Sequence, residues 1–196
     1  MTTTTEVTTR RAGRPRSTRV DQAIQDATLE LLVELGYGGM TIEGIAARAA
    51  VGKAAIYRRW ATKAELVVDS LRTHDGLQVP LPDTGDVRAD VEVMLGALQK
   101  AMAGDGGPVL AAFVAEKFRH PELRAEFDRV FVAERRRHLR YLVATAVERR
   151  ELPPETDIEL VAETGPALLC HRLFMHASPP EGDLPRRIVT QLFGLA

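Results

Sequence analysis

Residues 41–63 read TIEGIAARAAVGKAAIYRRWATK, a pattern that predicts two short helices joined by a tight turn. Thr41 stands where an N-cap residue would begin the first helix, and the sequence AVG at 50–52 ends that helix. Residues 53–60 then form the second helix. A short positioning helix, a sharp turn and a second helix with one buried and one bare side are the parts of a helix-turn-helix.

The second helix is expected to have two chemically different sides. Ile56 and Trp60 are four residues apart, so they pack inward together. On the other side, Lys53 and Tyr57 lie one turn apart, and the small Ala54 permits a close approach to another surface. Lys53 is suited to donate to guanine O6 and N7, and Tyr57 is suited to contact a thymine methyl group or a phosphate. The pattern therefore predicts a helix that enters the major groove of duplex DNA.

The residues on either side of this stretch complete a compact helical unit. Apolar residues recur every three or four positions from Val20 to Leu35, which is typical of an amphipathic helix, and Gly36 ends that helix. The sequence TKAE at 62–65 is a capping box that opens a further helix to about Arg72. We expect residues 18–74 to form one DNA-binding domain.

Positive charge is concentrated at the N-terminal end, although the formal net charge of the chain is -1. Residues 1–17 are rich in Thr and Arg and too polar to pack, so we expect a flexible basic arm. In the sequence GRPR at 13–16, Arg14 and Arg16 either enter a narrow minor groove or attract phosphates diffusely. This asymmetry predicts an end that faces DNA and a separate body. A second basic group consists of Arg48, Lys53, Arg58, Arg59 and Lys63.

The remainder of the chain, residues 75–196, is expected to form a second domain. A loop rich in Gly and Pro between Asp75 and Asp86 marks its start. Beyond this loop, apolar residues recur at helical spacing in five further segments, and none of them alternates as a strand does. The sequence thus predicts an all-α protein of about nine helices.

Several classes of protein are disfavoured by the sequence. The single cysteine, Cys170, leaves no internal disulfide and fits the reducing cytoplasm. No apolar stretch reaches the ~20 residues that a membrane span needs, and the N-terminus lacks the apolar core of a signal peptide. Cys170, His171 and His176 do not have the spacing of metal ligands. Since the sequence offers no nucleophile–base pair and no phosphate loop, we expect neither an enzyme nor a cofactor.

The helix-turn-helix region resembles the TetR family of transcriptional regulators over about residues 19–70. The resemblance implies phosphate contacts from Thr41, Tyr57 and Lys63, and base contacts from Lys53 and Ala54. Arg58 and Arg59 are neighbouring cations in the same expected surface. The matching residues are Thr41-x-x-x-Ile45-Ala46, Val51-Gly-Lys-Ala-Ala-Ile-Tyr57-Arg-Arg-Trp60 and Thr62-Lys63-Ala-Glu-Leu66.

Three residues in this region call for a physical account. Trp60 stands where the family mostly has Phe, which is a conservative change on the buried side. Ala50 stands where the family prefers Gly, so the turn is expected to be strained or shifted. Lys63 at a helix start opposes the helix dipole, and a phosphate would compensate for that.

The resemblance also implies a small-molecule effector that binds among the C-terminal helices. Met and Phe side chains suit a hydrophobic or aromatic ligand. The run Arg135-Arg136-Arg137-His138 is either a solvated face or, if partly buried, a site for an acidic group of the ligand. The expected walls of the ligand site are Met94, Leu98, Met102, Phe113, Phe127, Phe131 and Phe174.

The last two helices, at about 157–176 and 185–193, resemble the pair through which the family dimerises. The alternative is that they only complete the core of one protomer. The resemblance implies a homodimer that represses transcription from a pseudo-palindromic operator and is released by its effector. An activator and a non-specific architectural DNA-binding protein are the alternative functions, and no membrane partner is expected. The expected interface residues are Val161, Gly165, Leu168, Leu169, Ile188 and Leu192.

Overall fold

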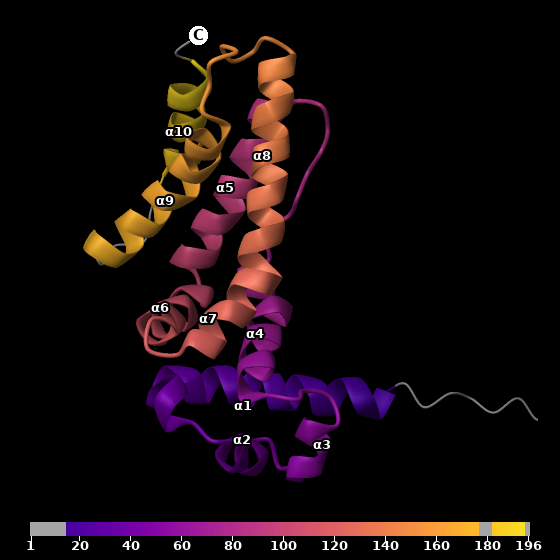
Figure 1. Ribbon diagram of the computed structural model, residues 1–196. Coiled ribbons are helices and arrows are strands. Elements are labelled where there is room, and N and C mark those ends of the chain that lie inside the picture. The colour runs from indigo at the N-terminus through magenta and orange to yellow at the C-terminus, as the bar shows by residue number, and fades with distance from the viewer. Residues whose placement is uncertain (1–14, 177–181, 195–196) are drawn as a thin grey trace, which may run out of the picture.

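The structure, a computed structural model, describes residues 15–176 and 182–194, and their regular secondary structure is entirely helical (Figure 1). A 3-10 turn, η1 (Asp75–Leu77), follows α4, and a π-helical turn, η2 (Asp128–Val132), joins α7 to α8 without a break. With α7 and α8 counted as one helix, the described residues form nine helices, so the predicted all-α fold is confirmed. The helices are α1 (Pro15–Gly39), α2 (Ile42–Arg48), α3 (Lys53–Tyr57), α4 (Lys63–Thr73), α5 (Val87–Ala103), α6 (Gly106–Lys117), α7 (Pro121–Phe127), α8 (Ala133–Glu148), α9 (Ile158–His176) and α10 (Leu184–Phe193).

The first helix begins at Pro15 rather than at the predicted Thr18. Proline favours the first turn of a helix, because its missing N–H would have no intrahelical partner there. Arg16 therefore belongs to α1 and not to the predicted arm. Residues 1–14 of that arm, including Arg14, lie outside the described residues.

Side-chain caps fix the starts of the short helices, as their sequences predict. The Thr41 hydroxyl accepts a hydrogen bond from the backbone N–H of Gly44 at 3.0 Å. Thr62 accepts from the N–H of Glu65 at 3.0 Å, and the Glu65 carboxylate accepts from the N–H of Ala61 at 2.8 Å. The N-cap of α2 and the capping box of α4 are therefore confirmed.

Two residues with positive φ set the turns on either side of α2. Gly36 has φ 68° and ψ 169°, so the regular part of α1 ends there as predicted. Ala50 has φ 53°, a conformation that is costly for a residue with a Cβ. The N–H of Ala50 bonds to Ala47 O at 3.2 Å and that of Val51 to Ala46 O at 2.9 Å, which is a Schellman closure. The strain predicted at Ala50 is confirmed.

Ala50→Gly is expected to raise the free energy of unfolding by about 0.5–1 kcal/mol. Removal of the Cβ relieves a left-handed conformation that costs about 1–2 kcal/mol. The greater freedom of glycine in the unfolded chain offsets about 0.4–1 kcal/mol of that gain. Urea unfolding followed by circular dichroism measures the difference. Ala47→Gly, at an exposed ordinary helical position, is the matched control and should be destabilising; a loss of stability in both variants would contradict the expectation.

Two hydrophobic clusters hold the molecule together. The first contains the apolar sides of α1 to α4 and continues into α6 and η2 through Val109, Phe113 and Phe131. The second joins α5, α8, α9 and α10. The change of composition at residues 75–86 therefore marks a loop, while the first cluster includes residues on both sides of it.

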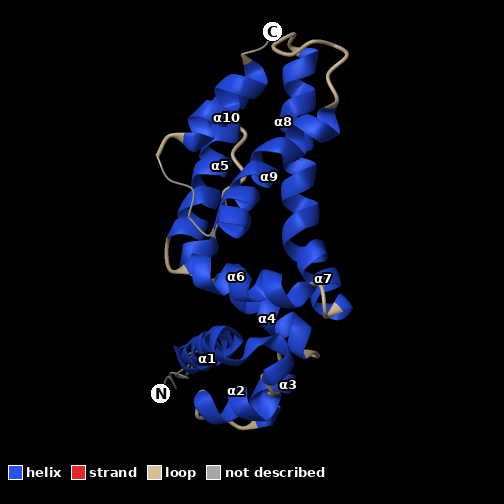
Figure 2. Ribbon diagram, turned by 90° about the vertical axis from the view of Figure 1, so that its left-hand side faces the viewer, coloured by secondary structure: helices blue, strands red, loops and turns tan. Residues whose placement is uncertain are grey.

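The helices form two parts, an N-terminal helix-turn-helix unit and an upright helical bundle. In Figure 1, α1 lies across the lower part of the molecule with α2 and α3 below it. Helices α5, α8, α9 and α10 stand above, and Figure 2 shows α6, α7 and α4 between the two parts. Helix α4 thus leads from the helix-turn-helix to the bundle.

Candidate nucleic-acid interface and ligand cavity

Helix α3 presents the two sides that its sequence predicts. Ile56 is fully buried at 0% exposure and Trp60, just after the helix, is also buried, whereas Tyr57 is 55% exposed. Direct contact with base edges and phosphates requires such an open side. The other exposed residues of the predicted reading surface are Lys53, Ala54 and Arg58.

A hydrogen-bond network holds the back of α3 against its neighbours. The indole Nε1 of Trp60 donates to Asp69 Oδ2 of α4 at 2.9 Å. Gln25 Nε2 of α1 donates to the same carboxylate oxygen at 3.1 Å. A phenylalanine at position 60 would have no donor for this carboxylate. Trp60 therefore fixes the orientation of α3 by a polar contact as well as by packing.

Lys53 is held by an ion pair on the exposed surface. Its Nζ lies 2.8 Å from Glu43 Oε1 of α2, and both side chains are more than half exposed. The hydrogen bond between them raises the pKa of Lys53 and lowers the pKa of Glu43. An exposed pair of this kind exchanges readily with other partners. Lys53 is therefore only loosely held by the protein, and its contact with a base stays a prediction.

Two other cations of the basic group are directed at the protein itself. Arg59 forms an ion pair with Asp21 of α1. Arg48 binds Glu30 at 3.1 Å and Glu34 at 2.8 Å, both on α1. These pairs tie α2 and α3 to α1, a role that charge alone did not reveal in the sequence. A DNA contact of Arg59 stays a prediction.

Lys63 lies against the segment that precedes α2. Its Nζ donates to Tyr37 O at 2.7 Å and to Met40 O at 3.0 Å, and lies 4.1 Å from the centroid of the Tyr37 ring. Burial lowers the pKa of Lys63. Two carbonyl oxygens and an aromatic face thus account for a cation at a helix start without a phosphate. The phosphate contacts of Lys63 and Thr41 stay predictions.

The same segment is joined to α6 on its other side. Glu116 Oε2 accepts from the N–H of Gly38 at 3.0 Å and lies 3.3 Å from His120 Nε2. The ring of His120 packs edge-on against Tyr37, with centroids 4.7 Å apart. This link joins residues 78 positions apart, which is why sequence periodicity did not reveal it.

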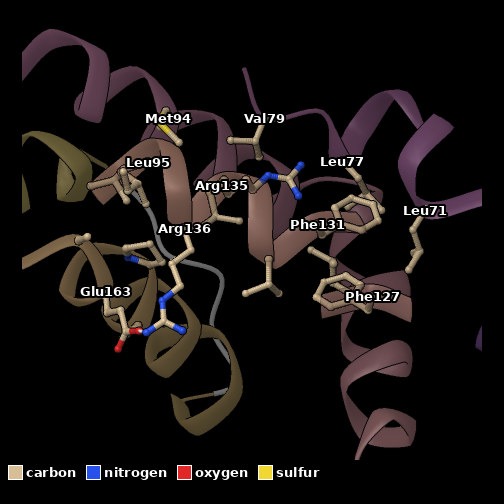
Figure 3. Close-up of a pocket in the computed structure, with 18 residues that line it drawn as sticks. Leu71, Leu77, Val79, Met94, Leu95, Phe127, Phe131, Arg135, Arg136 and Glu163 are labelled. Atoms are coloured by element: carbon tan, nitrogen blue, oxygen red, sulfur yellow. Dashed lines mark ion pairs between the residues drawn. The ribbon is translucent and has the colours of Figure 1, made fainter. Parts of the chain in front are cut away.

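A cavity of about 410 Å³ lies among α4, α5, α8 and α9 (Figure 3). This volume is within the usual range for small-molecule sites. Leu71 of α4 and Leu77 of η1 also belong to its wall, although their sequence pattern does not distinguish them from core residues. The predicted wall residues that do line it are Met94, Leu98, Phe127 and Phe131.

Three predicted wall residues do not line this cavity, and a ligand contact from them stays a prediction. Phe113 and Met102 are buried in the first and second hydrophobic clusters, respectively. Phe174 is 38% exposed on α9. Helical periodicity identifies the apolar side of a helix but not the neighbour that it faces, so core and cavity residues have the same pattern.

The cationic run in α8 is only partly a solvated face, because two of its members border the cavity. Arg136 Nη2 lies 2.6 Å from Glu163 Oε1 and 3.2 Å from Glu159 Oε2 of α9. Arg135 is half-buried and also lines the cavity.

The predicted dimer residues are divided between the protomer core and its surface. Leu169 and Ile188 are buried in the second hydrophobic cluster. Gly165 is buried against α5, where an added Cβ would lie 2.9 Å from Leu95 side-chain atoms. The close approach expected of a partner helix is thus made inside the protomer. The remaining three predicted residues, Val161, Leu168 and Leu192, are half-buried, whereas Leu160 and Met175 of α9 are exposed.

Residues 15–176 and 182–194 contain neither a cluster of metal ligands nor a membrane-spanning helix. No group of three or more His, Cys, Asp or Glu side chains is arranged there to hold a metal ion. None of the helices in these two ranges is both long and apolar enough to cross a membrane.

Two family models match the chain, one for each part of the fold. The model described as bacterial regulatory proteins, tetR family, matches residues 24–69. The model described as tetracyclin repressor-like, C-terminal domain, matches residues 81–192.

Curated relatives match over most of their length. An uncharacterized HTH-type transcriptional regulator of Mycobacterium tuberculosis is 32% identical over 166 residues, which are 83% of this chain and 80% of the relative. The DNA-binding transcriptional repressor TetR of Mycobacteroides abscessus is 31% identical over 154 residues, or 77% and 80% of the two chains.

Solved structures share the fold. A TetR family transcription regulator is 26% identical with a TM-score of 0.66, over 91% of this chain and 98% of that chain. FadR from Bacillus subtilis, in complex with stearoyl-CoA, is 17% identical with a TM-score of 0.66 over 87% and 96%. AibR, in complex with isovaleryl coenzyme A and operator DNA, is 18% identical with a TM-score of 0.64 over 89% and 98%.

Proposed function

Since this chain belongs to the TetR family of transcriptional regulators, we propose that it is a ligand-responsive repressor. A homodimer binds a pseudo-palindromic operator through residues 18–74, and a small hydrophobic molecule bound within residues 75–196 releases it. The protein is proposed to act by binding, without catalysing a reaction.

The exposed side of α3 carries this proposal. Tyr57 is open to solvent, while Ile56 and Trp60 anchor the opposite side. The helix is therefore fixed to the domain by its buried side and presents its exposed side to a partner. Lys53 and Ala54 stand in the first turn of α3, which is the part of a recognition helix that reaches base edges.

Dimerisation is proposed to use the outer surface of α9 and α10. Leu160 and Met175 are 64% and 71% exposed, and large apolar side chains at such exposure favour a protein contact. Two recognition helices must then lie about 34–36 Å apart, or a multiple of that, to enter successive major grooves. The separation is the property that an effector would alter.

Helix α4 is the proposed connection between effector and operator. Leu71, in its last turns, lines the cavity, and Lys63, at its start, holds the segment before α2. A ligand that displaces Leu71 would tilt the helix-turn-helix. Two similar folds have been solved with coenzyme A thioesters bound, which supports a small-molecule effector. A typical coupling of this kind changes DNA affinity about 5- to 150-fold.

Fluorescence anisotropy with two labelled duplexes tests the proposal. One duplex carries the DNA upstream of the protein's own gene, and the other has the same composition in scrambled order. We expect the upstream duplex to bind at least about 1,000-fold more tightly at one fixed salt concentration. Equal binding to both would make the protein an architectural one. Sedimentation should give a dimer, and a reporter gene under the upstream DNA should be silenced.

A further inference from the structure

One of the cations that border the cavity has no ion-pair partner in the described part of the chain. Three charged side chains border it, Arg135, Arg136 and Glu163. Arg136 and Glu163 neutralise each other across the 2.6 Å pair that joins α8 to α9. Among residues 15–176 and 182–194 Arg135 forms no ion pair, and only the charge of the neighbouring Glu134 acts on it at longer range.

The surroundings of Arg135 satisfy its guanidinium only in part. Its Nε is buried and has no hydrogen-bond partner in the described part of the chain. Its Cζ lies 4.7 Å from the centroid of the Phe131 ring, a cation–π contact that offsets part of the cost of burying the guanidinium, and burial lowers the pKa of Arg135. Figure 3 shows its side chain running towards Phe131, whereas Arg136 extends to Glu163. A buried donor that lacks an acceptor costs stability, and such groups are rare in folded proteins.

The π-helical turn explains why a cation on this helix faces the cavity. Phe127, Phe131, Arg135 and Leu139 all line it, at intervals of four residues. In a regular α-helix, each step of four residues overshoots a full turn by about 40°, so the last of these would face elsewhere. The turn at Asp128–Val132 accommodates about one extra residue, or roughly 100°, and so keeps all four on one side. Such turns are often found at functional sites.

We propose that Arg135 is the anion-binding group of this cavity, and that its ligand is an amphipathic organic acid: an apolar body with one carboxylate. The inference rests on the proposed function only in calling this ligand the effector; the binding site stands on the contacts above. Arg135 would donate to the carboxylate from its free Nε–H and its Nη groups. The apolar walls would cover the rest of the molecule.

The volume and charge of the cavity restrict the ligand further. A volume of about 410 Å³ lies in the range of sites that hold small organic molecules, which suits a body of about ten carbon atoms with a carboxylate. A phosphate monoester carries nearly two negative charges. One guanidinium would leave part of that charge uncompensated among apolar walls, so a carboxylate is favoured.

Calorimetry with matched acid and alcohol pairs tests the inference on the full-length protein without DNA. The linear pair is decanoate and decan-1-ol, and the aromatic pair is biphenyl-4-carboxylate and biphenyl-4-methanol. We expect the acid of at least one pair to bind wild-type protein roughly 10- to 150-fold more tightly than its alcohol, as a charge-assisted hydrogen bond provides. Equal affinities within both pairs, or no binding by any of the four, would overturn the inference.

The Arg135→Met variant separates the contribution of the guanidinium to ligand binding from that of the apolar walls. This variant should lose the preference for the acid and keep the affinity for the alcohol. Its melting temperature should rise by roughly 2–4 °C, because an unpaired buried donor is replaced by an apolar chain. Arg137→Met removes the same charge from an exposed position that does not line the cavity, and should keep the preference. Retention of the preference in Arg135→Met would overturn the inference.

The regulatory role is measured separately from the site. Release of the upstream duplex by the preferred acid is followed by anisotropy with wild-type and Arg135→Met protein. If the acid binds but the duplex is not released, the anion site stands and its role as effector site is refuted. If the duplex does not bind specifically at all, the proposed function fails while the calorimetric result is unaffected.

Discussion

Phe113→Ala is expected to lower the free energy of unfolding by about 3–5 kcal/mol, the largest effect anticipated for a single substitution here. Phe113 of α6 has 0% exposure and belongs to the hydrophobic cluster that also contains the buried residues of α1 to α4. Its ring centroid lies 4.4 Å from that of Phe127. Removal of the ring leaves a hole that a close-packed interior fills only in part.

Urea unfolding at constant pH measures this loss, with Phe118→Ala as the matched control. Phe118 directly follows α6 and is 72% exposed, so its truncation should change stability by less than about 0.5 kcal/mol. Because the cluster joins α6 to the helix-turn-helix, one cooperative transition should be lowered as a whole. A separate early transition with an unchanged main one would contradict the shared core.

Lys53→Ala is expected to weaken binding to the operator roughly 5- to 150-fold, the value of one bidentate base contact. Lys53 begins α3, and its ammonium is held on the exposed surface by Glu43 at 2.8 Å. Since the interaction depends on the identity of a base, binding to a scrambled duplex should weaken much less. Anisotropy titrations of both duplexes at the same salt concentration give the comparison.

Lys100→Ala is the control for the loss of a positive charge. Lys100 is exposed on α5, in the body of the molecule, so its removal should leave the ratio of the two affinities unchanged. An equal loss on operator and scrambled DNA by Lys53→Ala would reassign Lys53 to a phosphate.

The elements that depend on local sequence were predicted well. Capping residues at 41 and 62, the glycine at 36 and the strained alanine at 50 act through backbone groups within a few positions, so their sequence context is sufficient. The buried pair Ile56 and Trp60 followed from helical spacing in the same way. The resemblance to a family added the order of the domains and the expectation of an effector.

The contacts that were missed join distant parts of the chain. Lys63 donates to two carbonyl oxygens of the segment before α2, which helical spacing did not indicate, and its phosphate contact stays a prediction. Glu116 binds Gly38, and no periodic pattern relates residues so far apart. Phe113 and Phe131 both belong to the first hydrophobic cluster, but only Phe131 also lines the cavity. Which apolar residue meets a void is decided by packing between helices, not within one.

The cluster that crosses the loop at residues 75–86 limits how this regulator can be re-engineered. If this chain and another regulator exchanged domains at that loop, Val109 and Phe113 of one parent would pack against α1 of the other. Those two surfaces would not be complementary. Mismatched surfaces of this kind leave voids and clashes in the centre of the hybrid. A functional chimera would need to transfer α6 and the segment up to Phe131 together with the helix-turn-helix. Each DNA-binding domain would then keep the apolar surface against which it packs.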